Sequence, residues 1–172
     1  MSIQVSKTLS ETLKRCTVMD PDGGGHTVES LLAGRASLLL FIRHFGCIGC
    51  SENISLMAPR FTELNDLGVR TLIIGCGAPM FIEGFKERHH LLFSPAEIYS
   101  DESLASHQAA GLMYSAWGGF RPKAFYEMAR AFVSGNVSGD IQGDIKQQAG
   151  AIFVDEAGGS ACTTEMRALV TT

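Results

Sequence analysis

The sequence lacks several features that mark whole classes of proteins. No apolar run approaches the roughly 18 residues of a membrane helix, and residues 1–16 lack the apolar core and small-residue cleavage site of a secretory signal. Lysine and arginine together number 14 and do not cluster, and the formal net charge is -4, which gives nucleic acid or anionic lipid little to bind. We therefore expect a soluble cytoplasmic protein with neither nucleic acid nor membrane as a partner.

Cysteine is also scarce, and its number is odd. The five cysteines are Cys16, Cys47, Cys50, Cys76 and Cys162. Such a scattered set does not resemble a disulfide framework, and a reducing compartment keeps most cysteines as thiols. The stretch "GCGAPM" lacks the third glycine of a dinucleotide-binding fingerprint. We expect no bound cofactor, and any disulfide should be transient and chemical.

What the sequence does contain is the pattern of one α/β domain. Of its 172 residues 45% are hydrophobic and 19% charged, which suits a single globular domain over 1–172. Residues 37–45 and 69–77 are largely apolar without alternation, as in central strands covered by helices on both faces. Between them, apolar residues recur at spacings of four and three from Cys50 to Leu64, which predicts a helix ended by Gly68.

Further segments extend this alternation of strands and helices. The predicted elements are a short strand at 16–19 followed by a turn at 20–25, a helix at 79–91, a strand at 96–100, a helix at 101–112 with Asp101 as its N-cap, and an antiparallel hairpin at 149–164. Residues 113–148 have a looser pattern and are interpreted as an insertion. The order predicts a central mixed sheet flanked by helices.

The stretch "FIRHFGCIGC" leads from a predicted strand into two cysteines spaced Cys-x-x-Cys. Cys47 should lie in the turn before the helix and Cys50 in its first turn, where unsatisfied backbone N–H groups and the helix dipole stabilise a thiolate. Strand alternation predicts that Arg43 and His44 point to opposite faces, so that at most one of them assists Cys47 directly.

Three interpretations of the two cysteines are open. In the first, one thiol attacks an oxidised substrate and the other displaces the product by forming a Cys47–Cys50 disulfide. In the second they bind zinc, which needs about four ligands, but the remaining candidates are isolated cysteines and the divergent pair His89 and His90. In the third they are incidental. The strand-turn-helix context favours the redox pair, with no metal.

The same stretch resembles the active-site loop of the peroxiredoxin-like 2 family, a thioredoxin-fold branch of the alkyl hydroperoxide reductase/thiol-specific antioxidant superfamily. The segments "VMDPDGGGHTVESLL", "VRTLIIGCG", "IYSDESLASHQAAGL" and "GDIKQQAGAIFVDEAGG" extend the resemblance over most of the chain. The family includes prostamide/prostaglandin F synthase-type proteins, which reduce an endoperoxide at the expense of a dithiol. The resemblance implies a thioredoxin-like fold, redox chemistry at Cys47 and Cys50, and thioredoxin or another dithiol carrier as reductant.

The resemblance leaves two assignments of the nucleophile. A thioredoxin-like comparison places it at Cys47, whereas a peroxiredoxin-like comparison places it at Cys50. We favour Cys47, because helix geometry predicts that it is the more exposed thiol. Ile48 stands where the family commonly has a proline, and "CTTEMR" replaces the histidine-arginine usual after the last strand, which leaves room for a specialised substrate.

Other residues are candidates for supporting roles. Arg43 is a candidate to assist the thiolate, and Cys76 is either a third redox thiol or a buried small hydrophobe. Tyr114, Trp117 and Phe120 either form a lid over a small apolar substrate or pack within the insertion.

Three functional hypotheses follow from these residues. The first is a peroxiredoxin-like thiol oxidoreductase that reduces a peroxide, endoperoxide or disulfide. The second is a biosynthetic tailoring enzyme that uses the same dithiol on one small-molecule intermediate. The third is a redox-sensing or partner-binding module without turnover.

Overall fold

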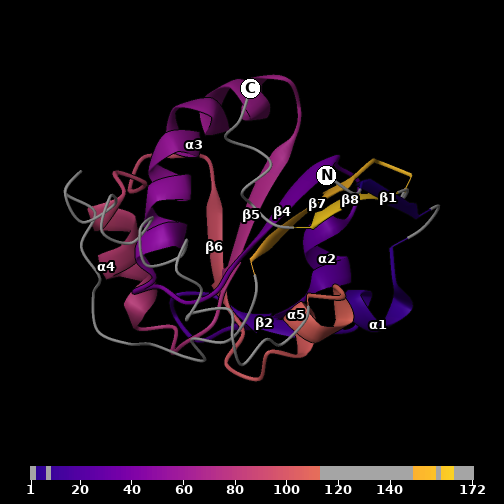
Figure 1. The fold of residues 1–172 in the computed structure, drawn as a ribbon, viewed down its shortest axis with the longest axis horizontal. Helices are drawn as coiled ribbons and strands as arrows, with labels where there is room; N and C mark the ends of the chain where they lie inside the picture. Colours follow the sequence, from indigo (N-terminus) through magenta and orange to yellow (C-terminus); the bar gives the residue numbers. More distant parts are fainter. Residues whose placement is uncertain (1–2, 7–8, 113–148, 158–159, 165–172) are drawn as a thin grey trace, which may run out of the picture.

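The apolar runs of the sequence form the centre of one mixed β-sheet. The computed structural model describes residues 3–6, 9–112, 149–157 and 160–164. These residues form eight strands in the order β1-β8-β7-β4-β5-β6-β2-β3 (Figure 1). The strands are β1 (Ile3–Ser6), β2 (Thr17–Met19), β3 (Gly25–Thr27), β4 (Ser37–Ile42), β5 (Arg70–Gly75), β6 (Glu97–Ser100), β7 (Gly150–Val154) and β8 (Ser160–Thr164). The central trio β4, β5 and β6 is parallel, and the other pairings are antiparallel.

Helices cover both faces of this sheet. They are α1 (Glu11–Lys14), α2 (Val28–Leu32), α3 (Ile48–Asp66), α4 (Phe81–Arg88) and α5 (Ala105–Ala109). In Figure 1, α3 and α4 lie on one side of the central strands, and α1, α2 and α5 lie on the other. The arrangement confirms the predicted mixed sheet flanked by helices.

The two faces of β4 explain its unbroken apolar character. Leu40 and Ile42 point into the cluster under α3 and α4, where they meet side chains such as Phe61. Leu39 and Phe41 point into the opposite cluster under α1 and α2. All four strand residues are fully buried, so neither face of the strand tolerates a polar residue.

Helix α3 ends as its sequence predicts. Gly68 has a φ of 81°, its N–H donates to the carbonyl of Asn65, and the N–H of Val69 donates to the carbonyl of Leu64. This pair of bonds is the Schellman motif, which needs a left-handed residue that glycine adopts without strain. The helix is continuous through Pro59.

The predicted helix at 101–112 is shorter in the structure. Leu104, with a φ of 60°, is the N-cap of α5, and Asp101 is not. The carboxylate of Asp101 instead accepts hydrogen bonds from both the N–H and the hydroxyl of Ser106. The acidic residue therefore still satisfies a helical N–H, but from a turn that precedes the helix.

Other predicted boundaries also extend too far. The helix predicted at 79–91 ends at Arg88, before His90 takes a φ of 56°, and the central strands end at Ile42 and Gly75. The C-terminal hairpin is confirmed as β7 and β8. The proposed insertion, residues 113–148, lies outside the described residues. Among the helices that the structure describes, none has the length and apolar character needed to span a bilayer.

Candidate functional site: a dithiol at the start of helix α3

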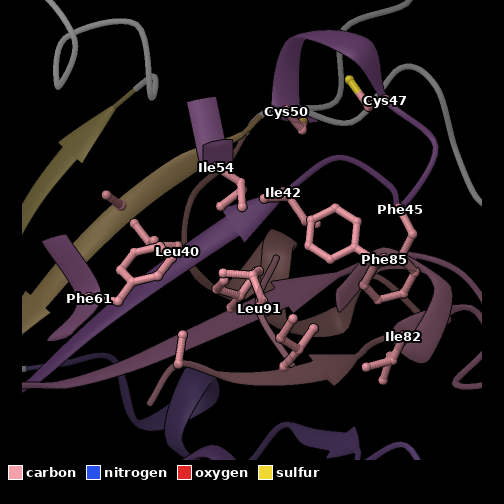
Figure 2. Close-up of a cluster of buried hydrophobic side chains, with 14 residues drawn as sticks. Leu40, Ile42, Phe45, Cys47, Cys50, Ile54, Phe61, Ile82, Phe85 and Leu91 are labelled. Carbon is pink, nitrogen blue, oxygen red and sulfur yellow. The ribbon is translucent and has the colours of Figure 1, made fainter. Parts of the chain in front are cut away.

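Both cysteines of the motif lie where β4 gives way to α3. Cys47 is the N-cap of α3 in an extended conformation, and Cys50 is in the first helical turn, as the sequence predicts. In Figure 2 both lie at one end of the buried cluster, beyond Ile42 and Phe45. Both thiols are free. The N-terminal N–H groups and dipole of α3 favour negative charge here.

The turn that carries Cys47 is held by residues that are distant in sequence. The ring of Phe45 packs so closely on Gly75, at the end of β5, that a Cβ there would lie 2.7 Å from a ring carbon. The same ring makes an edge contact with Phe85 of α4, with centroids 5.5 Å apart. Arg88 of α4 donates a 3.4 Å hydrogen bond to the Phe45 carbonyl. The turn is thus fixed against β5 and α4.

Cys50 is the inner of the two thiols. Its side chain is 2% exposed, and its Sγ accepts a 3.3 Å hydrogen bond from the backbone N–H of Arg43. Its interaction with Cys47, which ionises first, and its burial both raise the pKa of the Cys50 thiol well above the ordinary value. Cys50 is therefore protonated in the reduced protein.

Cys47 has the opposite acidity. Hydrogen bonding from the Cys50 thiol is the largest influence that lowers its pKa, to about 5, and it outweighs burial. The positive charge of Arg43, the N–H of Cys50 and the charge of His44 act in the same direction. The Cys47 side chain makes no capping hydrogen bond of ordinary geometry with α3, so these neighbours stabilise its thiolate. At 7% exposure, it is also more accessible than Cys50.

Arg43 and His44 directly follow β4 and act on the same thiol. Both favour the Cys47 thiolate by charge. Because β4 ends at Ile42, both residues lie in the turn, where strand alternation does not apply, and the division between two faces stays a prediction. Arg43 has the larger influence of the two on the Cys47 thiolate, and it interacts with both sulfurs. Its guanidinium lies 3.7 Å from the position that a Cβ on Gly49 would take.

The other candidate residues have different positions. Cys76 directly follows β5, at the carboxyl ends of the central strands, where the dithiol also lies. Its side chain is buried. Tyr114, Trp117 and Phe120 lie outside the described residues. Within the described part of the chain, no group of three or more His, Cys, Asp or Glu side chains is arranged to hold a metal ion.

Sequence reasoning missed several residues that shape the site. Among them are Phe45, Gly75, Arg88 and His107, and Nε2 of His107 lies 3.0 Å from the carbonyl oxygen of Ile42. Gly75 in the stretch "IIGCG" was the one available signal, because glycine in a strand often marks a close approach. For His107 the sequence offers only a polar residue inside a short helical pattern.

The chain has the thioredoxin-like α/β fold of peroxiredoxins. Reduced Prx3 from Vibrio vulnificus in complex with hydrogen peroxide superimposes with a TM-score of 0.66 at 17% identity, over 94% of this chain and 88% of that one. Peroxidoxin BcpB from Mycobacterium tuberculosis gives 0.64 at 12% identity, over 95% and 91%.

The sequence comparison identifies the family. Residues 56–168 match the model of the family described as AhpC/TSA antioxidant enzyme, which is more than half of the chain. The chain therefore belongs to the AhpC/TSA antioxidant enzyme family. The matched region begins after the dithiol. Family membership supports thiol oxidoreductase chemistry in general.

Two curated relatives are similar to this chain in sequence. The thioredoxin-like protein AAED1, chloroplastic, of Arabidopsis thaliana is 26% identical over 135 residues, or 76% of this chain and 52% of the relative. Peroxiredoxin-like 2C of Takifugu rubripes is 30% identical over 105 residues, or 59% of this chain and 45% of the relative. The chain thus spans about half the length of the curated relatives it matches.

Proposed function

We propose that the chain is a thiol-dependent oxidoreductase that reduces a peroxide, endoperoxide or disulfide through Cys47 and Cys50. One observation carries this proposal: two free thiols share the start of α3, Cys47 at its N-cap and Cys50 in its first turn, where their surroundings lower the pKa of Cys47 to about 5 and raise that of Cys50. Neighbouring groups whose environments separate their pKa values in this way have different roles in a reaction. The ionised Cys47 is the nucleophile, and the protonated Cys50 resolves the product.

For a hydroperoxide, the reaction has two steps on the protein. The Cys47 thiolate attacks one peroxide oxygen, the O–O bond breaks, and the leaving oxygen takes a proton to become an alcohol or water. Cys47 is then a sulfenic acid. The Cys50 sulfur attacks the Cys47 sulfur, the S–O bond breaks, and the hydroxyl leaves as water with the Cys50 proton, which yields the disulfide.

A second dithiol must return the enzyme to its reduced form. It supplies two electrons and two protons to the Cys47–Cys50 disulfide and becomes oxidised itself. We infer a thioredoxin-type carrier or another small dithiol reductant for this role. A cytoplasmic location and a small-molecule substrate stay predictions, and one relative is named chloroplastic.

The test is a single-turnover oxidation. The reduced protein receives one equivalent of an organic hydroperoxide, and mass spectrometry maps the linked cysteines and any sulfenic acid trapped by dimedone. We expect a rapid Cys47–Cys50 disulfide in the wild type. The Cys50→Ser variant should carry the trapped sulfenic acid on Cys47, and the Cys47→Ser variant should lose at least about a hundredfold in oxidation rate, because its nucleophile is gone.

Matched controls separate the dithiol from the other thiols. Cys16 is buried on the opposite face of the sheet, where its thiol donates a 3.2 Å hydrogen bond to the Thr12 carbonyl, so Cys16→Ala should oxidise at the wild-type rate. Cys76→Ala tests whether a third thiol participates. If the Cys47→Ser variant formed a sulfenic acid on Cys50 at the wild-type rate, the roles of the two cysteines would be reversed. If the wild type formed no Cys47–Cys50 disulfide, this chemistry would be excluded.

A further inference from the structure

We propose that His107 is a positioning residue for the dithiol and acts on Cys50 through the peptide group between Ile42 and Arg43. The inference rests on the proposed function, because it assigns a structural control to the resolving thiol. The carbonyl that His107 contacts and the N–H that reaches Cys50 belong to the same peptide group.

The two hydrogen bonds lie on opposite sides of that peptide. On one side, Nε2 of His107 lies 3.0 Å from the Ile42 oxygen. On the other side, the Arg43 nitrogen donates to Sγ of Cys50 at 3.3 Å. A peptide whose carbonyl accepts a hydrogen bond is polarised, so its N–H becomes a stronger donor. The imidazole therefore strengthens the bond that holds the Cys50 sulfur, although the ring never touches it.

The protonation state of His107 follows from its partner. A carbonyl only accepts hydrogen bonds, so Nε2 must carry the proton. The ring is fully buried, and burial lowers the pKa of His107, which keeps the imidazole neutral with a bare Nδ1. Within the described residues this Nδ1 has no hydrogen-bond partner. Among the described residues, the hydrogen bond to the Ile42 carbonyl is thus the one contact that the ring nitrogens make.

Neighbouring residues hold the His107 ring in this position. The ring makes an edge contact with Phe41, at 5.2 Å between centroids. The preceding residue, Ser106, is bound through both N–H and hydroxyl to the Asp101 carboxylate. The N–H of Asp101 in turn donates to the Gly75 carbonyl at the end of β5. These hydrogen bonds connect helix α5 to the carboxyl end of β5, beside the dithiol turn.

The consequence concerns the resolving step. Cys50 must lose its proton as it attacks the oxidised Cys47, and a donor on its sulfur stabilises the developing negative charge. A weaker Arg43 donor also lets the sulfur move away from its place at the end of β4. Removal of His107 should therefore slow the formation of the disulfide from the sulfenic acid more than the formation of the sulfenic acid itself.

The experiment compares three full-length variants with the wild type. His107→Leu removes the donor, and His107→Gln keeps an N–H at a similar distance. His89→Leu removes a comparably buried histidine that contacts Ser55 and packs on Phe85, where leucine keeps an apolar contact. Two quantities are measured: the amide proton shift of Arg43 in the reduced protein, and the rate of disulfide formation after one equivalent of hydroperoxide.

We expect His107→Leu to move the Arg43 amide proton upfield and to slow disulfide formation by on the order of threefold to tenfold. His107→Gln should restore both quantities toward the wild-type values, and His89→Leu should change neither. Equal effects of His107→Leu and His89→Leu, or no rescue by glutamine in a folded protein, would overturn the proposal.

A measurement on the wild type keeps the inference testable if His107→Leu does not fold. The His107 ring should carry its proton on Nε2, and its Nε2–H resonance should shift when the dithiol is oxidised, because the peptide connects them. A proton on Nδ1, or a resonance indifferent to oxidation, would contradict the relay. A wild type that forms no Cys47–Cys50 disulfide would instead refute the proposed function, while the tautomer and the Arg43 shift would still test the contact.

Discussion

Two turns of this protein are built in opposite ways. The turn between β2 and β3 is made by its own residues: Oδ1 of Asp20 accepts hydrogen bonds from the N–H groups of Asp22 and Gly24, and Oδ2 lies 2.8 Å from Nε2 of His26. The dithiol turn after β4 is fixed by residues from other elements, among them Gly75 and Arg88. The first turn is local and the second is tertiary.

The difference shows what each turn can do. A turn that satisfies its own backbone needs little from the rest of the protein, and it connects two strands. The dithiol turn keeps two thiols buried at a helix start with unlike acidities, which no short segment achieves alone. Its chemistry therefore depends on packing far from the cysteines, and substitutions should affect the two turns very differently.

The substitution with the largest expected effect on stability is Gly75→Ala. The new Cβ would lie 2.7 Å from the Phe45 ring, and the buried ring has little room to move because it packs against Phe85. Overpacking of this kind costs about 1–3 kcal/mol. We expect that loss in the free energy of unfolding, measured by urea denaturation, together with roughly tenfold slower disulfide formation, because the turn that carries Cys47 must shift.

A glycine of α4 provides the matched control for this substitution. A Cβ on Gly84 would meet no atom within 4 Å, so Gly84→Ala should be neutral or stabilise the helix by up to about 1 kcal/mol. The double variant Gly75→Ala, Phe45→Leu should regain part of the stability because the smaller side chain makes room. If Gly75→Ala were as stable and as fast to oxidise as Gly84→Ala, the dithiol turn would not depend on this contact.

A smaller effect is expected within the dithiol itself. Because the Cys50 thiol is the main group that lowers the pKa of Cys47, Cys50→Ala should raise that pKa from about 5 by about one to two pH units. Cys50→Ser keeps a hydroxyl donor and should stay closer to the wild type. The pH dependence of Cys47 alkylation measures both. Midpoints that stay near 5 in both variants would assign the low pKa of Cys47 to Arg43 and the helix instead.

The same pKa predicts how stability depends on pH. The pKa of Cys47 is lower in the folded protein than the value of about 8.5 for an unfolded cysteine, so the thiolate favours folding. This contribution is complete above about 8.5 and is lost as the pH falls through about 5. Because Cys50→Ala raises the pKa of folded Cys47, this variant should lose the contribution at a higher pH than the wild type does as the pH falls.

The contrast also explains how far the sequence could predict the structure. The turn at 20–25, the glycine that ends α3 and the helix-start positions of both cysteines follow from local patterns, and all are confirmed. Residue separations set the limit for the rest. His107 lies 65 positions from Ile42 and Arg88 lies 43 positions from Phe45, so their contacts depend on how the elements pack. Local periodicity carries no information on such packing.

The smallest effect should come from Asp20→Ala in the local turn. The variant loses the acceptor of two backbone N–H groups, but the turn is exposed and water replaces the carboxylate, so we expect a fall in Tm of about 2 °C or less and an unchanged rate of disulfide formation. Hydrogen bonding with His26 lowers the pKa of Asp20, so the difference from the wild type should vanish as the pH falls below that value. Asp20→Asn keeps an oxygen acceptor and should show a smaller difference without this pH dependence. A slowed dithiol in either variant would mean that the two turns are coupled through the sheet, and the division between a local and a tertiary turn would fail.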